Sequence, residues 1–351
     1  CTAPLNFGQV VSYYCPFEVF VNPGLAHNRS FTDGAEVIVK QLARTIVVIS
    51  ILLLTVSCSS QTAATRIEAF STAVALTTNN TRSAFEAVER VHHEMLAARV
   101  VANYDKKGFQ PDEIKPLLRT EELAARMRVL DALQIYAQKL TVIMGDSQLS
   151  AFDLQAKEFG GDLAALTNNL VRQQYLSKNS TISDRDIGLF TTAINALGRW
   201  FIEWTRDRKI KDEVKSIQLY VREICRLLSE DLGTTSQESG SKDAAGLRAI
   251  VWNDFTDTLQ QQDEFIGHNR KALGPVATRA EVLQLIALVS NRAQTDATLK
   301  ATQTALKSLR ETHEKLADAL EQHPGEFEQS VMQLVMEGNK IKYFYEQLNK
   351  K

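Results

Sequence analysis

The chain has 351 residues, with 40 lysines and arginines against 42 aspartates and glutamates and a formal net charge of −2. This length suffices for one large domain or two smaller ones. The charge balance argues against nucleic acid as a partner, which requires a basic face. The most basic stretch, TRDRKIKDEVK at 205–215, is interrupted by acidic residues.

The most apolar stretch of the chain lies near its beginning. Residues 45–56, TIVVISILLLTV, contain no charged side chain, and Lys40 and Arg44 precede them. A helix that crosses a bilayer needs roughly 20 apolar residues, so this run is too short. It matches the apolar core of a secretory signal, roughly 7–15 residues behind a positively charged start. We therefore expect a signal peptide over residues 37–57. The alternative is a buried apolar helix followed by an ordinary, unreactive thiol at Cys58.

The end of this run carries a lipid-attachment pattern. Leu54-Thr55-Val56-Ser57-Cys58 resembles the lipobox of bacterial lipoproteins, although Thr55 and Val56 depart from the commonest Leu-Ala/Ser pattern. In that class the cysteine thiol receives a diacylglycerol group, the leader is cut just before it, and the new amino terminus is usually acylated. The resemblance implies that Cys58 carries palmitate-type chains and anchors the protein to a lipid bilayer. Ser59, a residue other than Asp, implies the outer membrane, with the protein facing the periplasm.

The residues before the apolar run look different from the rest. The chain begins at Cys1 and contains no methionine before Met95, and residues 1–36 show neither helical nor strand periodicity. We interpret residues 1–36 as upstream sequence outside the native protein, with a non-Met start codon at Val37 or Val39. The alternative is that they belong to a genuine, truncated protein.

From residue 61 onward the apolar residues recur every three or four positions, as one face of a helix requires. This pattern predicts an all-α fold, an elongated antiparallel helical bundle with long, coiled-coil-like helices. Other stripes run through 149–170, 299–320 and 327–348, and a further helix is expected between Thr120 and Met144. The first stripe predicts a helix of about 40 residues, roughly 60 Å long. It comprises Ile67, Phe70, Val74, Thr77, Thr81, Ala84, Val88, Val91, Met95, Ala98 and Ala102.

Two interruptions suggest how the bundle is divided. Between 183 and 229 the apolar register shifts at TRDRK, 205–209, which predicts one long helix with a charged middle or two helices that meet there. The Ser/Gly-rich segment 233–246 is the best candidate for a flexible connection. We therefore assign residues 58–231 to a first bundle. Residues 245–351 form a second bundle or continue the first.

Residues that could support catalysis or bind a metal are few. Glu89 and His92 have the Glu-x-x-His spacing of di-iron bundles, but no second copy exists, so a solvated or capping pair is the simpler interpretation. His313 lies on a leucine-rich stripe and is expected to be a hydrogen-bonded core histidine, and Cys225 a packed core thiol. No phosphate-binding glycine loop or nucleophile elbow occurs. We therefore expect no catalytic residue, no metal and no cofactor.

One aromatic cluster stands out. GRWFIEWTR, residues 198–206, places Trp200 and Trp204 one helical turn apart, with Phe201 beside them. Core packing is the leading interpretation. The alternative is a groove that accepts a partner helix or an apolar ligand, and these three residues are the candidate partner or ligand surface.

Together these features favour a membrane-anchored envelope lipoprotein that binds another envelope protein as a non-catalytic scaffold, assembly or immunity-type factor. The body is similar to uncharacterised all-helical lipoproteins of Gram-negative bacteria, a likeness that transfers no site residues. Two alternatives stay open. One is a helical-bundle carrier of a small apolar or metal ligand. The other is an envelope hydrolase, since a site assembled from distant helices leaves no local motif.

Overall fold

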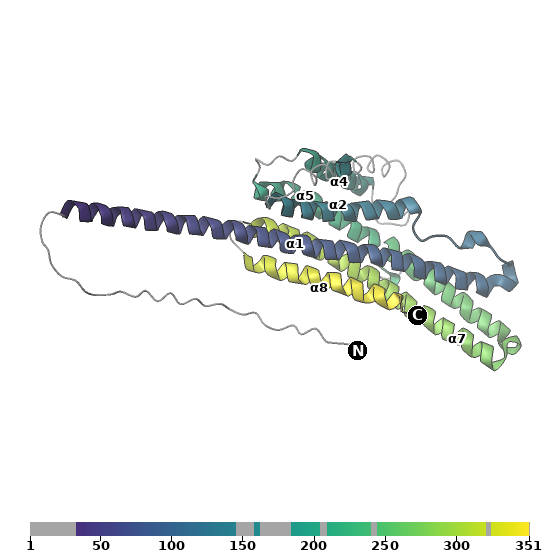
Figure 1. The fold of residues 1–351 in the computed structure, drawn as a ribbon. Coiled ribbons are helices and arrows are strands. Elements are labelled where there is room, and N and C mark those ends of the chain that lie inside the picture. The colour runs from purple at the N-terminus through teal and green to yellow at the C-terminus, as the bar shows by residue number, and fades with distance from the viewer. Residues whose placement is uncertain are drawn as a thin grey trace, which may run out of the picture. The chain divides into compact units, whose positions relative to one another are not determined.

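The structure, a computed structural model, describes residues 33–144, 158–161, 184–203, 209–239, 244–320 and 324–350. The predicted all-α fold is confirmed, since no β-strand occurs in these ranges (Figure 1). The chain divides into two compact units, residues 1–56 and 57–351. The interpretation of residues 1–36 falls almost wholly outside the described residues. The helices are α1 Asp33–Lys107, α2 Thr120–Met144, α4 Asp184–Glu203, α5 Ile210–Leu232, α6 Ser236–Ser239, α7 Gly246–Ala319 and α8 Pro324–Leu348, with a 3-10 turn at Pro111–Glu113.

Helix α1 buries the face that its sequence predicts. All the stripe residues from Ile67 to Ala102 are buried, including Thr77 and Thr81 in the weakly apolar middle. Helix α2 has the predicted bounds and lies antiparallel to α1, because Thr78 contacts Gln134 and the Arg82 guanidinium contacts Asp131. The three-four periodicity therefore located both core faces, but α1 has 75 residues and not about 40, because it also includes the apolar run before the stripe.

Helix α7 is a hairpin of two antiparallel arms, residues 246–273 and 275–319. The backbone leaves the helical conformation at Gly274, with φ 68° and ψ 176°, and Pro275 begins the second arm. A positive φ of this kind is readily adopted only by glycine. The amide of Gln262 donates to Glu281 at 2.8 Å, and Arg248 pairs with Asp296 at 2.8 Å, which fixes the antiparallel register.

The α7 hairpin joins α1 and α8 into one bundle, with α8 beside α1 in Figure 1. The first arm contacts α1 through the Arg99 guanidinium, which donates to Thr258 Oγ1 at 2.9 Å. Asn80 Nδ2 donates to the Gly338 carbonyl at 2.9 Å and so links α1 to α8. Thr312 Oγ1 donates to the Ser330 carbonyl at 3.0 Å and links the second arm to α8. The buried apolar residues of these helices and of α2, α4 and α5 form one main core.

The register change after residue 204 corresponds to two helices. Lys209 has an extended backbone before α5 begins, so the two-helix alternative is the one observed. Trp200 Nε1 donates to the carboxylate of Glu213, which shows that α5 folds back against α4. Two separate helices explain why their apolar faces follow different registers.

The described residues of the Ser/Gly-rich connection, 233–239 and 244–246, make specific contacts with one another and with α7. Thr234 and Ala245 form an antiparallel bridge with N···O distances of 2.9 and 3.1 Å. The Arg248 guanidinium, buried in the bundle, lies 2.8 Å from Glu238 on α6. Serine and glycine content suggested mobility here, whereas an arginine beyond the segment ties it to α7.

Candidate functional site

The predicted aromatic surface is part of the core. Trp200 is 6% exposed and Phe201 0%, so neither ring is open to a partner. Core packing, the leading interpretation of the sequence, therefore applies to both, while Trp204 lies outside the described residues. The side chain of Cys58, the predicted lipidation site, also lies outside them, although its backbone falls within α1.

Trp200 and Phe201 belong to a buried cluster that also contains polar groups. The Tyr136 hydroxyl lies 2.7 Å from His313 Nε2, and the Trp200 ring meets Tyr136 edge-on with centroids 5.1 Å apart. Lys139 Nζ donates to the Phe201 carbonyl at 2.9 Å and lies 5.2 Å from the Trp200 centroid. Each polar group here is thus held by a structural contact.

Burial fixes the protonation states in this cluster. It lowers the pKa of His313 to about 3. Burial, with the charge of Glu213 as a smaller cause, raises the pKa of Tyr136 well above its ordinary value. Both groups are therefore neutral near pH 7. A general base functions best with a pKa near the working pH, and neither group meets that requirement.

Glu89 and His92 contact different parts of the structure. The Glu89 carboxylate accepts backbone N–H groups of Leu117 at 2.9 Å and Leu118 at 3.2 Å, just before α2. His92 Nε2 lies 3.0 Å from Asp254 on α7. Among the described residues no cluster of three or more His, Cys, Asp or Glu side chains could hold a metal ion. Glu89 therefore holds the segment before α2, and His92 forms an interhelical pair; the sequence revealed neither contact.

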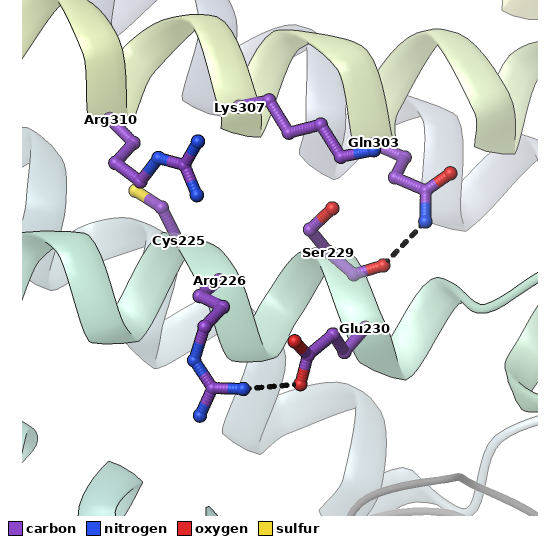
Figure 2. Close-up of a pocket in the computed structure, with 7 residues that line it drawn as sticks. All are labelled: Cys225, Arg226, Ser229, Glu230, Gln303, Lys307 and Arg310. Carbon is purple, nitrogen blue, oxygen red and sulfur yellow. Dashed lines mark hydrogen bonds and ion pairs between the residues drawn. The ribbon is translucent and has the colours of Figure 1, made fainter.

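A basic cavity of about 230 Å³ lies between α5 and the second arm of α7 (Figure 2). Arg226 on α5 is paired with Glu230 at 2.6 Å. Lys307 and Arg310 approach from α7, and the Arg310 guanidinium lies 3.8 Å from the carboxylate of Glu311. Arg310 Nε is buried and has no hydrogen-bond partner in the described part of the chain. The cavity therefore favours an anionic group from outside.

Cys225 lies at the inner wall of this cavity, close to Arg310 in Figure 2. Burial raises the pKa of its thiol to about 12, and the positive charge of Arg310 offsets this only in part. Because the thiolate is the reactive form of cysteine, this thiol is unreactive at neutral pH. The predicted packed core thiol is confirmed.

No protein family, no curated protein and no solved structure matches the chain. The cavity in Figure 2 was not predicted from the sequence. Arg226 on α5 lies about 80 positions before Lys307 and Arg310 on α7. Single basic residues are common on the polar side of a helix, so none of the three indicated a site. Only the packing of α5 on α7 brings them together.

Proposed function

We propose that this protein is a lipid-anchored envelope protein that acts as a non-catalytic, protein-binding scaffold, assembly or immunity-type factor. The observation that carries the proposal is the lipobox-type pattern ending at Cys58, which lies within helix α1 and from which the helix continues to Lys107. From Cys58 to Lys107 the helix rises roughly 75 Å at about 1.5 Å per residue. Because the helix continues from the lipid-attachment site into the bundle, the anchor is joined directly to the body that carries the binding surfaces. The outer membrane is the location that Ser59 implies.

The state of the buried titratable groups supports a non-catalytic role. His313 and Cys225 are neutral near pH 7, with pKa values of about 3 and about 12. Catalytic groups are usually tuned in the opposite direction, toward the working pH. The interior polar groups therefore stabilise the bundle, and partner binding falls to the exposed faces of the helices.

The basic cavity between α5 and α7 is the surface patch that we assign to the protein partner. Lys307 is exposed and has no ion-pair partner among the described residues. Arg310 lines the same cavity and contributes a second positive charge. An Asp or Glu side chain of a partner would supply both the charge and the acceptor. Pairs of this kind contribute most to specificity and association rate.

Lipidation is tested first, in cells that process lipoproteins. The wild-type chain should incorporate labelled palmitate, and Cys58→Ala should abolish the label and leave unprocessed precursor. Cys225→Ala is the matched control, because it removes a buried thiol and should leave the label unchanged. Absence of label from the wild-type chain would refute the anchor.

Partner binding is tested by capture from the native envelope with a crosslinker. Lys307→Glu with Arg310→Glu should reduce the amount of captured partner at least tenfold, because two negative charges would then face the partner's carboxylate. Lys340→Glu with Lys342→Glu, an exposed pair on α8, is the control. Equal capture by both double variants would exclude the cavity, and capture of no protein would refute the scaffold proposal.

A carrier of a small apolar ligand is the second candidate, because one groove favours it. A hollow of about 430 Å³ lies between the end of α1 and the first arm of α7, lined mostly by apolar side chains, among them Val101, Tyr104, Phe109 and Phe265. Native mass spectrometry of protein purified from the envelope would reveal a bound apolar molecule. Val101→Asp should displace that molecule if this groove holds it.

A further inference from the structure

The bend of the α7 hairpin exposes an unusual amount of apolar surface. Val276 is 85% exposed, Leu283 57% and Ile286 58%, and Val282 and Val289 are also exposed. Helix α7 also contains an 18-residue window that is apolar enough by composition to cross a membrane, and only 6% of that window is buried. Exposed apolar patches of this kind mark interaction sites.

The charges around the bend are positive and unpaired. From residue 265 to residue 289 the basic residues are Arg270, Lys271 and Arg279, and the acidic residue is Glu281. Glu281 accepts a hydrogen bond from Gln262 between the two arms. No described residue forms an ion pair or hydrogen bond with any of the three cations. The bend therefore carries a local charge of +2 in a chain whose net charge is −2.

These two features meet in one place. A hollow of about 560 Å³ at the bend is lined by all three cations and by Thr278, Val282 and Leu283. Guanidinium groups bind phosphate oxygens well because their N–H donors are planar and always charged. A phosphate next to apolar side chains is the chemistry of a phospholipid headgroup and its attached chains.

We propose that the bend of the α7 hairpin binds the surface of an anionic phospholipid bilayer. Val276, Leu283 and Ile286 enter the region between headgroups and acyl chains, and the three cations contact phosphates. Exposed apolar residues flanked by Lys and Arg are typical of helices that lie in this interface. The hairpin does not cross the bilayer, because the reversal at Gly274 divides the apolar window into segments shorter than the roughly 20 residues needed.

The charges also argue against a second copy of the chain as the occupant. A two-fold interface brings the same surface of both molecules together, and it would set three unpaired cations against three others. Such like-charge contacts oppose association. An anionic bilayer instead offers acyl chains to the apolar residues and phosphates to the cations.

A fluorophore at the bend tests this proposal in the full chain. Val276→Cys receives an environment-sensitive label after Cys1, Cys15 and Cys58 are changed to Ser; Cys225 is buried and stays unlabelled. On vesicles of phosphatidylcholine with phosphatidylglycerol, the emission should shift to the blue and be quenched by bromine on the acyl chains. Vesicles of phosphatidylcholine alone should give neither change. A label at Met332→Cys, exposed on α8, should respond to neither vesicle.

Two sets of variants separate the cations from the apolar residues. Arg270→Gln, Lys271→Gln and Arg279→Gln together should weaken binding of the bend roughly a hundredfold, since each cation at an anionic surface contributes about fivefold. Leu283→Asp with Ile286→Asp should abolish the blue shift, and both residues are exposed, so the fold should persist. The control triple Arg222→Gln, Lys340→Gln and Lys342→Gln removes three exposed cations elsewhere and should retain the shift.

Three results would overturn the proposal. One is the absence of a shift on anionic vesicles, and another is an equal shift on neutral ones. The third is a shift that depends on protein concentration without vesicles, which would assign the bend to a second copy. The experiment is performed without the Cys58 thiol, so its result does not depend on whether palmitate labelling succeeds.

Discussion

Arg126 and Asp231 show how much a single buried pair contributes to this bundle. The Arg126 guanidinium on α2 donates from two nitrogens to the two Asp231 oxygens on α5, both at 2.8 Å. Their side chains are 4% and 1% exposed. A buried charge pair is costly to form but far more costly to break, because the remaining charge stays buried without a partner.

We therefore predict that Asp231→Ala destabilises the protein by about 3–5 kcal/mol. Urea unfolding followed by circular dichroism measures this change. The control is Glu346→Ala, which removes an exposed carboxylate paired with Lys342 at 3.9 Å and should change stability by less than about 0.5 kcal/mol. Equal effects of the two substitutions would contradict the assignment.

His313 makes stability depend on pH in a defined window. Burial lowers its folded-state pKa to about 3 from an ordinary value of 6.5. Because the folded pKa is depressed, the neutral imidazole contributes full stability above pH 6.5, and this contribution is lost as the pH falls toward 3. The slope from one proton is at most about 1.4 kcal/mol per pH unit.

Between pH 6.5 and 5 this slope should be visible, because ordinary carboxylates titrate mostly below that range. We predict that His313→Gln is less stable than the wild type at pH 7 and loses the slope. His268→Gln, a change at an exposed histidine, should retain it. Urea unfolding at a series of pH values checks both, and a wild-type stability that is flat between pH 6.5 and 5 would be incompatible with a buried, neutral His313.

Sequence patterns were informative for residues whose role follows from a helical face. His313 and Cys225 lie on apolar stripes, and both are core residues as predicted. The pairing of His92 with Asp254 could not be predicted, because the two residues are 162 positions apart. The charge clusters at the cavity and at the hairpin bend likewise depend on which helices meet.

At the scale of the helix, the three-four periodicity of apolar residues predicts which face is buried, but it does not predict where the chain reverses direction. The stripe through 299–320 became the buried face of the second α7 arm. The sequence LGP at 273–275 indicated that a helix is interrupted there, but not that the chain folds back into a hairpin. The hairpin follows from the positive φ of Gly274 and from the contacts between the arms, Gln262 with Glu281 and Arg248 with Asp296.

The connection between α5 and α7 depends on a second glycine with a positive φ. Gly233 has φ +69°, and a Cβ built on it would lie 1.8 Å from the Ala245 carbonyl oxygen. We predict that Gly233→Ala destabilises the protein by at least about 1–3 kcal/mol, the usual range for a strained backbone. Thermal or urea unfolding would measure it.

Gly267 provides the matched control for this substitution. It lies within the first arm of α7, and a Cβ added there meets nothing within 4 Å. Gly267→Ala should stabilise the protein by up to about 1 kcal/mol, because alanine favours the helix over glycine. If both glycine variants were stabilised, the close approach at Gly233 would not constrain the connection.

At the scale of the whole molecule, the contacts favour one folding unit from residue 57 to the end of the chain. The sequence suggested a division near 233–246, because serine and glycine gather there. Yet α7 packs on α5 and also on α8, and the main buried core includes residues from Ile67 to Leu348. One core thus contains residues from both predicted parts, which favours the alternative in which residues 245–351 continue the first bundle.

This shared core predicts a single cooperative unfolding transition. Leu130 on α2 and Leu334 on α8 are both fully buried in the main core, one in each predicted part. Leu130→Ala and Leu334→Ala should each lower the free energy of unfolding by about 2–5 kcal/mol. Each should shift a single transition in which both predicted parts unfold. Far-ultraviolet circular dichroism and tryptophan fluorescence should give the same midpoint for each variant. If Leu334→Ala shifted one midpoint and left the other in place, the two parts would be separate domains. In a single unit, by contrast, the α7 hairpin with its proposed lipid-binding bend unfolds together with the first bundle.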